Sequence, residues 1–279
     1  MATDHARRRE FSLSEGEFNE IRALVRTHTG IALAPSKREL VYGRLVRRLR
    51  RLKLDTFRAY IGLLERGEAA ELEQFTNAIT TNLTSFFRES HHFDYLRETV
   101  LAELEVRNSA TRRIRVWCAG CSTGEEAYSV AMVLAEAGAR FRGWDVRVLA
   151  TDLDSHVLAV AEAGVYGAER LAKLPPAARA RWFTGSAGGR SVACPQLKSL
   201  VAFRRLNLVR EWPFSGPFDV ILCRNVVIYF DRQTQCELFA RMAAQQRAGD
   251  HLFVGHSESL FKLSDRYQLI GRTIYRRLE

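Results

Sequence analysis

The sequence predicts an α/β fold: a largely parallel sheet covered by helices on both faces, with a small antiparallel β insertion, preceded by a small all-helical domain. From residue 113 onward, short apolar runs alternate with helical stretches, which is the pattern of strand–turn–helix units. Before residue 113, apolar residues recur at helical spacing instead. The chain has 279 residues, 47% of them hydrophobic, which is enough for one large domain, or for a small domain joined to a medium-sized one.

Two helices with N-terminal capping signals are predicted near the start of the chain. Ser14 is followed by Glu17, and Ser36 is followed by Glu39; each pair has the spacing of a capping box. The second helix runs through "KRELVYGRLVRRLRRL", and further helices are expected at "DTFRAYIGLLERG" and "AAELEQFTNAIT". We therefore expect a helical domain at 11–76.

The second helix combines an apolar stripe with a basic face. Its apolar residues share one narrow stripe: Val41, Leu45, Leu49 and Leu52. Its basic residues lie together on an adjoining face: Lys37, Arg44, Arg47, Arg48 and Arg51. No acidic residue at helical spacing neutralises these arginines. The face is therefore either a solvated surface or a docking surface for an acidic partner.

The rest of the chain is predicted to form the α/β domain, at 111–279. Strands are expected at "RIRVWCA", "WDVRVLATD", "FDVILCRN" and "HLFVGH", and the tail "YQLIGRTIYRRL" is expected to add an antiparallel strand at the sheet edge. A β subdomain is expected at about 181–206. We expect 1–10 to be a disordered basic N-terminus, and 77–110 to be a linker helix that contributes to the active site.

Composition limits the class of protein. Basic residues outnumber acidic ones by ten, so we expect an acidic partner: nucleic acid, an anionic membrane or an acidic protein. No run approaches the roughly 18 apolar residues of a membrane span, and the start "MATDHARRRE" lacks the apolar segment of a secretory signal. The five cysteines are odd in number and lie mostly in apolar runs. This favours reduced, buried thiols in a cytoplasmic protein.

A glycine turn in "RIRVWCAGCSTGEEAYSVAM" joins a predicted strand to a predicted helix. In α/β sheets this position binds nucleotide-like ligands. A Walker loop is excluded, because only three residues separate Gly120 from Gly124 and Glu125 stands at the position of the lysine. The G-x-G-x-x-G fingerprint is absent, and no second Cys-x-x-Cys completes a zinc site. A thioredoxin-like redox site at Cys118 and Cys121 stays open.

Acidic residues around this turn favour a positively charged nucleoside ligand over a phosphate. Glu125 or Glu126 is placed to pair with an ammonium group. Asp152 ends the next predicted strand, where an acid usually accepts both ribose hydroxyls. S-adenosylmethionine, with its sulfonium, α-ammonium and ribose diol, fits these groups. The residues therefore indicate methyl transfer.

Six segments taken together resemble the chemotaxis receptor methyltransferases, the CheR family. They are "TNLTSFFRESHHF", "WCAGCSTGEEAYS", "ATDLD", "NL", "FDVILCRNVVIYFD" and "GHSES". The resemblance implies a Rossmann-like, S-adenosylmethionine-dependent methyltransferase domain. It also implies O-methylation of glutamate side chains on the cytoplasmic helices of chemoreceptors, for adaptation in chemotaxis-type signalling. We expect S-adenosylmethionine as cofactor, with S-adenosylhomocysteine as its product, no metal, no nucleic-acid partner, no membrane insertion and a monomer.

The resemblance assigns roles to individual residues. The positions that contact the cofactor or frame the active site are Asn82, Thr84, Arg88, Glu126, Asp152, Asn207, Leu208, Arg224 and Asn225. Arg88 and Tyr229 are expected to be catalytic, with Tyr229 close to the transferred methyl group. The receptor-docking face is expected to consist of Arg44, Arg47, Arg48 and Arg51.

One departure from the family concerns the β insertion. Some members use it to bind a peptide tether at the C-terminus of the receptor. The loop "GSAGG" at Gly185–Gly189 is predicted to be shorter than in those members. We therefore expect recognition through the basic helix alone, without tether binding.

Other interpretations stay open. The basic charge also fits a nucleic-acid methyltransferase, although a D/N-P-P-Y motif is absent, and a non-catalytic module that binds S-adenosylmethionine or a receptor is possible. Asn82 and Thr84 have the residue types of helix caps, and His91 and His92 those of capping residues or metal ligands. "GHSES" resembles a nucleophile elbow, but Ser259 replaces its last glycine.

Overall fold

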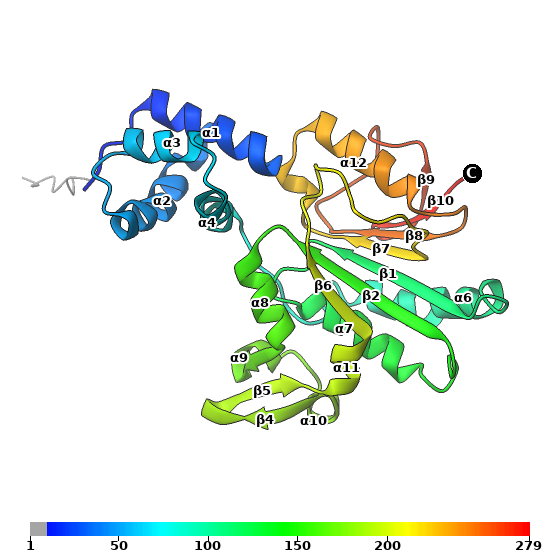
Figure 1. Cartoon of the computed structure of the whole chain (residues 1–279). Coiled ribbons are helices and arrows are strands. Elements are labelled where there is room, and N and C mark those ends of the chain that lie inside the picture. Colours follow the sequence, from blue (N-terminus) through cyan, green and yellow to red (C-terminus); the bar gives the residue numbers. More distant parts are fainter. Residues whose placement is uncertain (1–9) are drawn as a thin grey trace, which may run out of the picture. The chain divides into compact units, whose positions relative to one another are not determined.

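The computed structural model describes residues 10–279, with the backbone alone at 186 and 187. It falls into two compact units, Met1–Thr80 and Thr81–Glu279 (Figure 1). The disordered N-terminus expected at 1–10 lies, up to residue 9, outside the described residues.

The described part of the first unit consists of helices. They are α1 (Glu15–Thr29), η1 (Pro35–Lys37), α2 (Arg38–Leu52), α3 (Phe57–Glu65) and α4 (Ala69–Ile79). Their apolar faces meet in a single core. The apolar stripe predicted on α2 is confirmed, because Val41, Leu45 and Leu49 are buried there.

The two predicted capping boxes have different outcomes. At α1, the backbone N–H of Glu17 donates to Ser14 Oγ over 3.2 Å, and the N–H of Ser14 donates to the Glu17 carboxylate over 2.8 Å. The box predicted at Ser36 and Glu39 is wrong, because Ser36 lies inside the 3-10 turn η1. Pro35 starts that turn, so Ser36 is already helical and does not take the extended conformation of an N-cap.

A seven-stranded sheet forms the centre of the second unit, in the order β6-β2-β1-β7-β8-β10-β9 (Figure 1). The strands are β1 (Arg113–Ala119), β2 (Asp145–Asp152), β6 (Val201–Arg205), β7 (Val220–Cys223), β8 (His251–Val254), β9 (Tyr267–Gly271) and β10 (Ile274–Arg277). The strands from β6 to β8 in this order are parallel, whereas β10 is antiparallel to both of its neighbours. The predicted α/β fold is confirmed, and the tail forms a hairpin of two strands rather than one strand.

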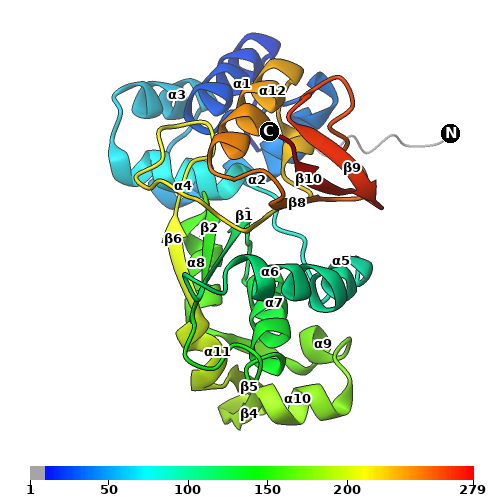
Figure 2. The ribbon, with the colours of Figure 1, turned by 90° about the vertical axis from the view of Figure 1, so that its right-hand side faces the viewer.

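Helices cover both faces of this sheet. Cys118 of β1 belongs to the core that contains α7 (Glu125–Glu136), whereas Trp117 belongs to the core that contains α12 (Arg232–Ala244). Successive side chains of a strand point to opposite faces, so α7 and α12 cover different sides of the sheet (Figure 2). The other helical segments are α5 (His91–Tyr95), η2 (Leu96–Val100), α6 (Leu101–Arg107), α8 (Ser155–Ala163), α9 (Ala168–Leu171), α10 (Pro176–Trp182), η3 (Ala187–Gly189), α11 (Pro195–Leu200) and η4 (Val227–Tyr229).

The single linker helix expected at 77–110 is not observed. Helix α4 extends to Ile79, residues 80–90 form loops and turns, and helical structure runs from α5 through η2 into α6. The loop segment "TTNLTSFFRES" is rich in Thr, Ser and Asn, whose side chains compete with helical backbone hydrogen bonds.

The small antiparallel sheet exists, but its strands differ from those predicted. It has the order β3-β5-β4, with β3 at Val165–Gly167, β4 at Phe183–Ser186 and β5 at Arg190–Ala193. The insertion expected at about 181–206 therefore ends too late, because β6 pairs with β2 in the large sheet. In the edge strand β6, only the central residue is buried. A strand of the small antiparallel sheet would have a similar exposure pattern, so the sequence did not show which sheet β6 joins.

Candidate active site

The carboxyl edge of the parallel strands carries several predicted site residues. Asp152 ends β2, Asn207 follows β6 and Arg224 follows β7. The N–H of Leu206 donates to the carbonyl oxygen of Asp152 over 2.9 Å, so the ends of β2 and β6 lie together. Ligands of α/β sheets bind at this edge.

The glycine turn between β1 and α7 packs closely against its neighbours. Gly120 and Gly124 have φ angles of 93° and 94°, which glycine adopts without strain. A Cβ atom on Gly120 would lie 2.3 Å from Cγ2 of Val226, and one on Gly124 would lie 2.8 Å from Cβ of Ala161. Both the backbone conformation and the packing of the β7 loop and α8 therefore require glycine here.

Asp152 fastens this turn to the end of β2. Its Oδ2 accepts the N–H of Ser122 over 2.7 Å, and its Oδ1 accepts the N–H of Asp154 over 3.0 Å. Burial raises the pKa of Asp152, while these N–H donors act in the opposite direction. Each carboxylate oxygen has a second lone pair, so the acid can accept ribose hydroxyls in addition to holding the turn.

The segment that contains Asn82, at 81–90, is tied to the same turn. Asn82 Nδ2 donates to Asp154 over 2.7 Å, and Ser122 Oγ donates to the carbonyl oxygen of Asn82 over 3.2 Å. Asp154 is the N-cap of α8. The interpretation of Asn82 as a helix cap is therefore wrong, since Asn82 supports the acid that performs the capping.

Arg88 lies in a strained part of this segment. The flanking residues Phe87 and Glu89 have φ angles of 49° and 57°, which are uncommon for such side chains. The N–H of Phe87 donates to Ser129 Oγ over 3.0 Å, and Arg88 Nη1 donates to the carbonyl oxygen of Leu83 over 2.8 Å. Contacts to the neighbouring elements thus hold the backbone of Arg88 in place. Thr84 is half-buried in the same segment.

Arg224 is the central charge of the site. Its side chain is 1% exposed, and its Nη1 donates to Glu126 over 2.9 Å, while Nη2 lies 3.4 Å from Glu89. Nη2 also donates to the carbonyl oxygen of Arg88, and the guanidinium lies 5.5 Å from the ring centre of Phe93. Arg224 therefore joins α7 to the 81–90 segment.

The two carboxylates beside Arg224 have opposite pKa shifts. Burial raises the pKa of Glu126 to about 7, although Arg224 favours its charged form. Burial also acts to raise the pKa of Glu89, but the hydrogen bond from His256 and the charge of Arg224 outweigh it and hold that pKa at about 2. Glu89 is therefore charged at neutral pH, whereas Glu126 titrates close to neutrality.

The structure separates the roles of Glu125 and Glu126, which the sequence left open. Thr123 Oγ1 donates to Oε2 of Glu125 over 2.6 Å, and Arg170 pairs with Oε1. Both oxygens of Glu125 are thus engaged in holding the turn. Glu126 is the better candidate for binding an ammonium group.

Cys118 and Cys121 do not form a reactive dithiol site. Both are buried, and burial raises the pKa of each thiol well above its usual value. A reactive thiol needs a lowered pKa. The thioredoxin-like alternative is therefore wrong.

The remaining predicted cofactor positions lie in the loops after β6 and β7. Asn207 Oδ1 accepts the N–H of Val209 over 3.1 Å, and Asn225 has a φ of 58°. Leu208 is a buried core residue. Tyr229 is half-buried at the end of η4.

Glu258 is a residue that the sequence interpretation missed. Its buried carboxylate accepts four backbone N–H groups, from Asn225, Val226, Val227 and Gly255. The available signal was an acid four residues after the end of the apolar strand in "HLFVGHSES". The elbow interpretation of this segment is wrong, because β8 is followed by turns and not by a helix.

The histidine pair is structural. Nε2 of His92 lies 3.0 Å from Thr273 Oγ1, and Nε2 of His91 lies 3.2 Å from the carbonyl oxygen of Arg272. Burial lowers the pKa of His92 to about 3, so its ring is neutral. Among residues 10–279, no group of three His, Cys, Asp or Glu side chains is arranged to hold a metal ion.

The four arginines of the predicted docking face have two different environments. Arg44 donates to the carbonyl oxygens of Ile79 and Thr80, and Arg48 forms an ion pair with Glu71. By contrast, the exposed members of the set are Arg47 and Arg51. No acid at i+4 on α2 neutralises Arg48, but Glu71 of α4, which is distant in the sequence, does.

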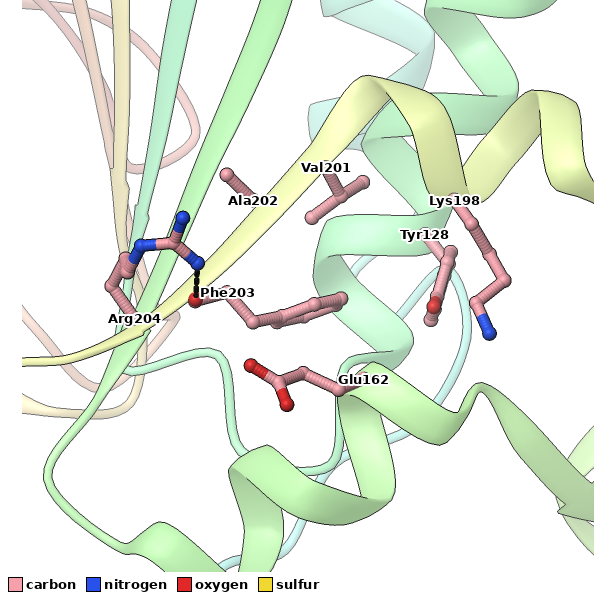
Figure 3. Close-up of a pocket in the computed structure, with 7 residues that line it drawn as sticks. All are labelled: Tyr128, Glu162, Lys198, Val201, Ala202, Phe203 and Arg204. Atoms are coloured by element: carbon pink, nitrogen blue, oxygen red, sulfur yellow. Dashed lines mark hydrogen bonds between the residues drawn. The ribbon is translucent and has the colours of Figure 1, made fainter.

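A separate pocket of about 280 Å³ lies beside the edge strand β6 (Figure 3). It is lined by Tyr128, Glu162, Lys198, Val201, Ala202, Phe203 and Arg204. None of the predicted cofactor residues lines this pocket. Within residues 10–279, no helix is long and apolar enough to cross a bilayer.

The sheet order, the glycine turn and the acid at the end of β2 together define a domain of the S-adenosylmethionine-dependent methyltransferase class. The family model described as the S-adenosylmethionine-binding domain of CheR methyltransferase matches residues 82–276, and the model of the CheR all-alpha domain matches residues 16–80. The chain belongs to the CheR methyltransferase family, as the resemblance implied.

Several chemotaxis protein methyltransferases are similar to this chain over most of their length. Chemotaxis protein methyltransferase 2 of Pseudomonas aeruginosa is 43% identical over 270 residues, which cover 95% of this chain and 94% of the relative. The chemotaxis protein methyltransferase of Escherichia coli is 43% identical, with 95% and 91% covered, and that of Borreliella burgdorferi is 36% identical, with 89% and 90% covered. The chain is an S-adenosylmethionine-dependent methyltransferase of chemotaxis adaptation, which confirms the class of activity drawn from the sequence.

Proposed function

We propose that the chain forms glutamyl methyl esters on the cytoplasmic helices of chemoreceptors. The observation that carries this proposal is the similarity to chemotaxis protein methyltransferases across both units. The excess of ten positive charges also suits an acidic helical substrate.

The residues at the carboxyl edge fit S-adenosylmethionine. The α-ammonium group would pair with Glu126, and the ribose hydroxyls with Asp152. Asn82, Thr84, Asn207, Leu208, Arg224 and Asn225 would line or support the same site. S-adenosylmethionine supplies an activated methyl group when it is bound. The buried acids favour a cationic ligand, because a phosphate in their place would be repelled.

The enzyme's own contribution is chiefly positioning. A glutamate side chain has a reference pKa near 4.3 and is already an anionic nucleophile at neutral pH, so no general base is required. Arg88 would orient the incoming carboxylate through a charge-assisted hydrogen bond, and Tyr229 would donate a hydrogen bond beside the path of the methyl group. Holding the reacting atoms in line is the main source of acceleration.

The product gives the modification its effect. A methyl ester is neutral, so each transfer removes one negative charge from a receptor helix. A change in charge alters the packing of neighbouring helices without any change in fold.

Only two of the four arginines expected to dock the receptor are exposed in the structure. Arg47 and Arg51 are exposed on α2 and are available to acidic residues of a receptor, whereas Arg44 and Arg48 stabilise the helical unit from within. We keep the proposal that recognition uses this helix and does not need a tether. Tight binding of a receptor C-terminal peptide would contradict the second part.

The direct test is transfer of radiolabelled methyl from S-adenosylmethionine to a chemoreceptor cytoplasmic fragment, with nucleic acid as a parallel substrate. Alkali-labile label on the receptor would establish a carboxyl methyl ester. Label on nucleic acid would replace the proposal by a nucleic-acid methyltransferase. Bound cofactor without transfer to either would favour a regulatory module.

Asp152→Ala is expected to weaken cofactor binding by about 10- to 100-fold, because it removes charge-assisted hydrogen bonds worth about 1.5–3 kcal/mol. Turnover at saturating cofactor should fall less. Asp145→Ala is the matched control, since Asp145 is exposed at the other end of β2. Calorimetry with S-adenosylhomocysteine measures the affinities. Normal binding by Asp152→Ala would show that the ribose assignment is wrong.

Arg88→Ala and Tyr229→Phe are expected to show the reverse pattern. Turnover should fall about tenfold for Arg88→Ala, and severalfold for Tyr229→Phe, because each loses a contact to the reacting groups. Cofactor affinity should change less than turnover. Steady-state kinetics and calorimetry on the same preparations separate the two effects. A selective loss of cofactor affinity in either variant would remove that residue from the catalytic role.

Cofactor affinity is expected to fall as the pH falls below about 7. Burial raises the pKa of Glu126 to about 7, so at lower pH a proton must leave before the carboxylate can pair with an ammonium group. The affinity should therefore fall by up to about tenfold per pH unit. The pKa values of His92 and His251 are lowered by burial to about 3 and about 4, so neither ring takes up a proton above pH 5.

Calorimetry with S-adenosylhomocysteine between pH 5.5 and 7 checks this expectation, because an α-amino group stays mostly protonated in that range. Charged groups near Glu126 are Arg224, Glu89 and Glu258. Glu126→Gln is the control, and its weaker binding should vary less with pH than that of the wild type. An equal slope in the wild type and Glu126→Gln would assign the effect to another group.

A further inference from the structure

Glu258 lies after β8, in the segment "GHSES", and the resemblance assigns no role to it. Its side chain is buried, with the residue 5% exposed. Oε1 accepts the N–H groups of Val226 and Val227 over 2.8 and 2.9 Å, and Oε2 accepts the N–H of Asn225 over 2.8 Å. Oε2 also accepts the N–H of Gly255. A single carboxylate thus satisfies four backbone donors.

These bonds determine the path of the loop after β7. Asn225 has a φ of 58°, and three successive N–H groups from 225 to 227 converge on one point. Buried backbone N–H groups without an acceptor are strongly unfavourable. The end of β8 also packs against this loop, because a Cβ on Gly255 would lie 2.3 Å from Nδ2 of Asn225.

The loop carries groups at the centre of the site. Arg224 precedes it and pairs with Glu126, and Val226 packs on Gly120 of the glycine turn. Tyr229 follows in η4. Any displacement of 225–227 therefore shifts the arginine, the turn contact and the tyrosine together.

We propose that Glu258 is a positioning residue for methyl transfer: its carboxylate holds the 225–227 backbone in the conformation that presents Asn225 to the cofactor and Tyr229 to the reacting groups. This inference rests on the roles proposed above for Asn225 and Tyr229. Glu258 acts through the loop and does not itself touch the substrate.

The ionised carboxylate is essential to this role. Only the ionised form leaves both oxygens as pure acceptors, whereas in the protonated form one oxygen carries an O–H donor. In Glu258→Gln, an NH₂ group replaces one oxygen and faces two backbone donors. Two hydrogen bonds are then lost, although the size of the side chain is kept.

The test compares Glu258→Gln with Asp219→Asn. Asp219 precedes β7 and is also buried, and its carboxylate accepts the N–H of Arg115 over 2.7 Å and Nδ2 of Asn108 over 2.8 Å. Both substitutions replace a buried carboxylate by an amide, but Asp219 lies before β7, whereas Glu258 binds the backbone of the loop after β7. For each full-length variant, we would measure the dissociation constant of S-adenosylhomocysteine and the hydrogen exchange of the 224–231 segment, well below the unfolding temperature.

We expect Glu258→Gln to weaken binding by about tenfold or more and to speed exchange at 225–227. Asp219→Asn should keep its affinity within about twofold, even if it is equally destabilised. Gly255→Ala displaces Asn225 without changing any charge, and should also weaken binding if Glu258→Gln does not fold. Unchanged affinity in the Glu258 and Gly255 variants, or an equal loss in Asp219→Asn, overturns the inference. Failure of the wild type to bind would instead contradict the cofactor site itself.

Discussion

Arg224→Ala is expected to lower the free energy of unfolding of the α/β unit by about 3–5 kcal/mol, which is the usual effect of removing one partner of a buried ion pair. The substitution leaves Glu126 and Glu89 without their common cation. It also removes the donor to the carbonyl oxygen of Arg88. Urea unfolding followed by tryptophan fluorescence measures this effect, because all four tryptophans lie beyond residue 81.

Two controls distinguish this effect from a general loss of charge. Arg140 pairs with Glu105, and both side chains are about 40% exposed, so Arg140→Ala should change stability by about 1 kcal/mol at most. Arg224→Ala should recover more stability than the wild type as the pH is lowered from 8 to 6. Burial raises the folded-state pKa of Glu126, so its protonated form stabilises the fold, and this stabilisation is lost as the pH rises through that pKa. Removing Arg224 raises the pKa of Glu126 further, so the variant gains more free energy of unfolding than the wild type between pH 8 and pH 6. If Arg224→Ala lowered the free energy of unfolding by less than about 1 kcal/mol, the ion pair of Arg224 with Glu126 would not be important for stability.

Arg48→Ala is expected to destabilise the helical unit by about 3 kcal/mol. Arg48 Nε donates to Glu71 over 3.0 Å, and Tyr60 donates to the same carboxylate over 2.7 Å. The Arg48 and Glu71 side chains are only 12% and 7% exposed. Without Arg48, Glu71 would stay buried with a hydrogen bond but no counter-charge. Hydrogen exchange in the peptides of α2 and α4 measures the loss, with the α/β unit as an internal reference.

Arg47→Ala is the matched comparison, because Arg47 is the exposed neighbour of Arg48. It should change stability by about 0.5 kcal/mol or less and should weaken binding to a chemoreceptor fragment, more so at low salt. If Arg48→Ala left exchange unchanged, its role would be docking, as the sequence suggested. If Arg47→Ala bound receptor normally, the docking role of α2 would be wrong.

Much of the fold was predictable because it depends on local patterns. The alternation of apolar runs and helices predicted the parallel sheet, and the capping box at Ser14 predicted the start of α1. The capping box predicted at Ser36 is wrong because the 3-10 turn that begins at Pro35 places Ser36 inside helical structure. Strand β6 was assigned to the wrong sheet, since its exposure pattern does not show which strand it pairs with.

The candidate site was predictable to the extent that it follows from topology. The carboxyl ends of parallel strands meet at one edge, so the glycine turn, Asp152 and Arg224 were expected to lie together. Their partners were not predictable. Ion pairs such as Arg224 with Glu126, and hydrogen bonds such as Glu258 with Asn225, join residues far apart in sequence.

By itself, the sequence determined the main parallel strands and their helices, the glycine turn, the acids beside it and the family. These features depend on short-range periodicity and on residue types at fixed spacing. Only the tertiary structure decided that Arg48 is internal while Arg47 is exposed, and that Glu125 holds the turn while Glu126 pairs with Arg224. It also decided that the Glu258 carboxylate binds the loop after β7. The physical reason is that burial and charge pairing depend on which distant elements pack together, and neighbouring residues in the sequence carry no record of that packing.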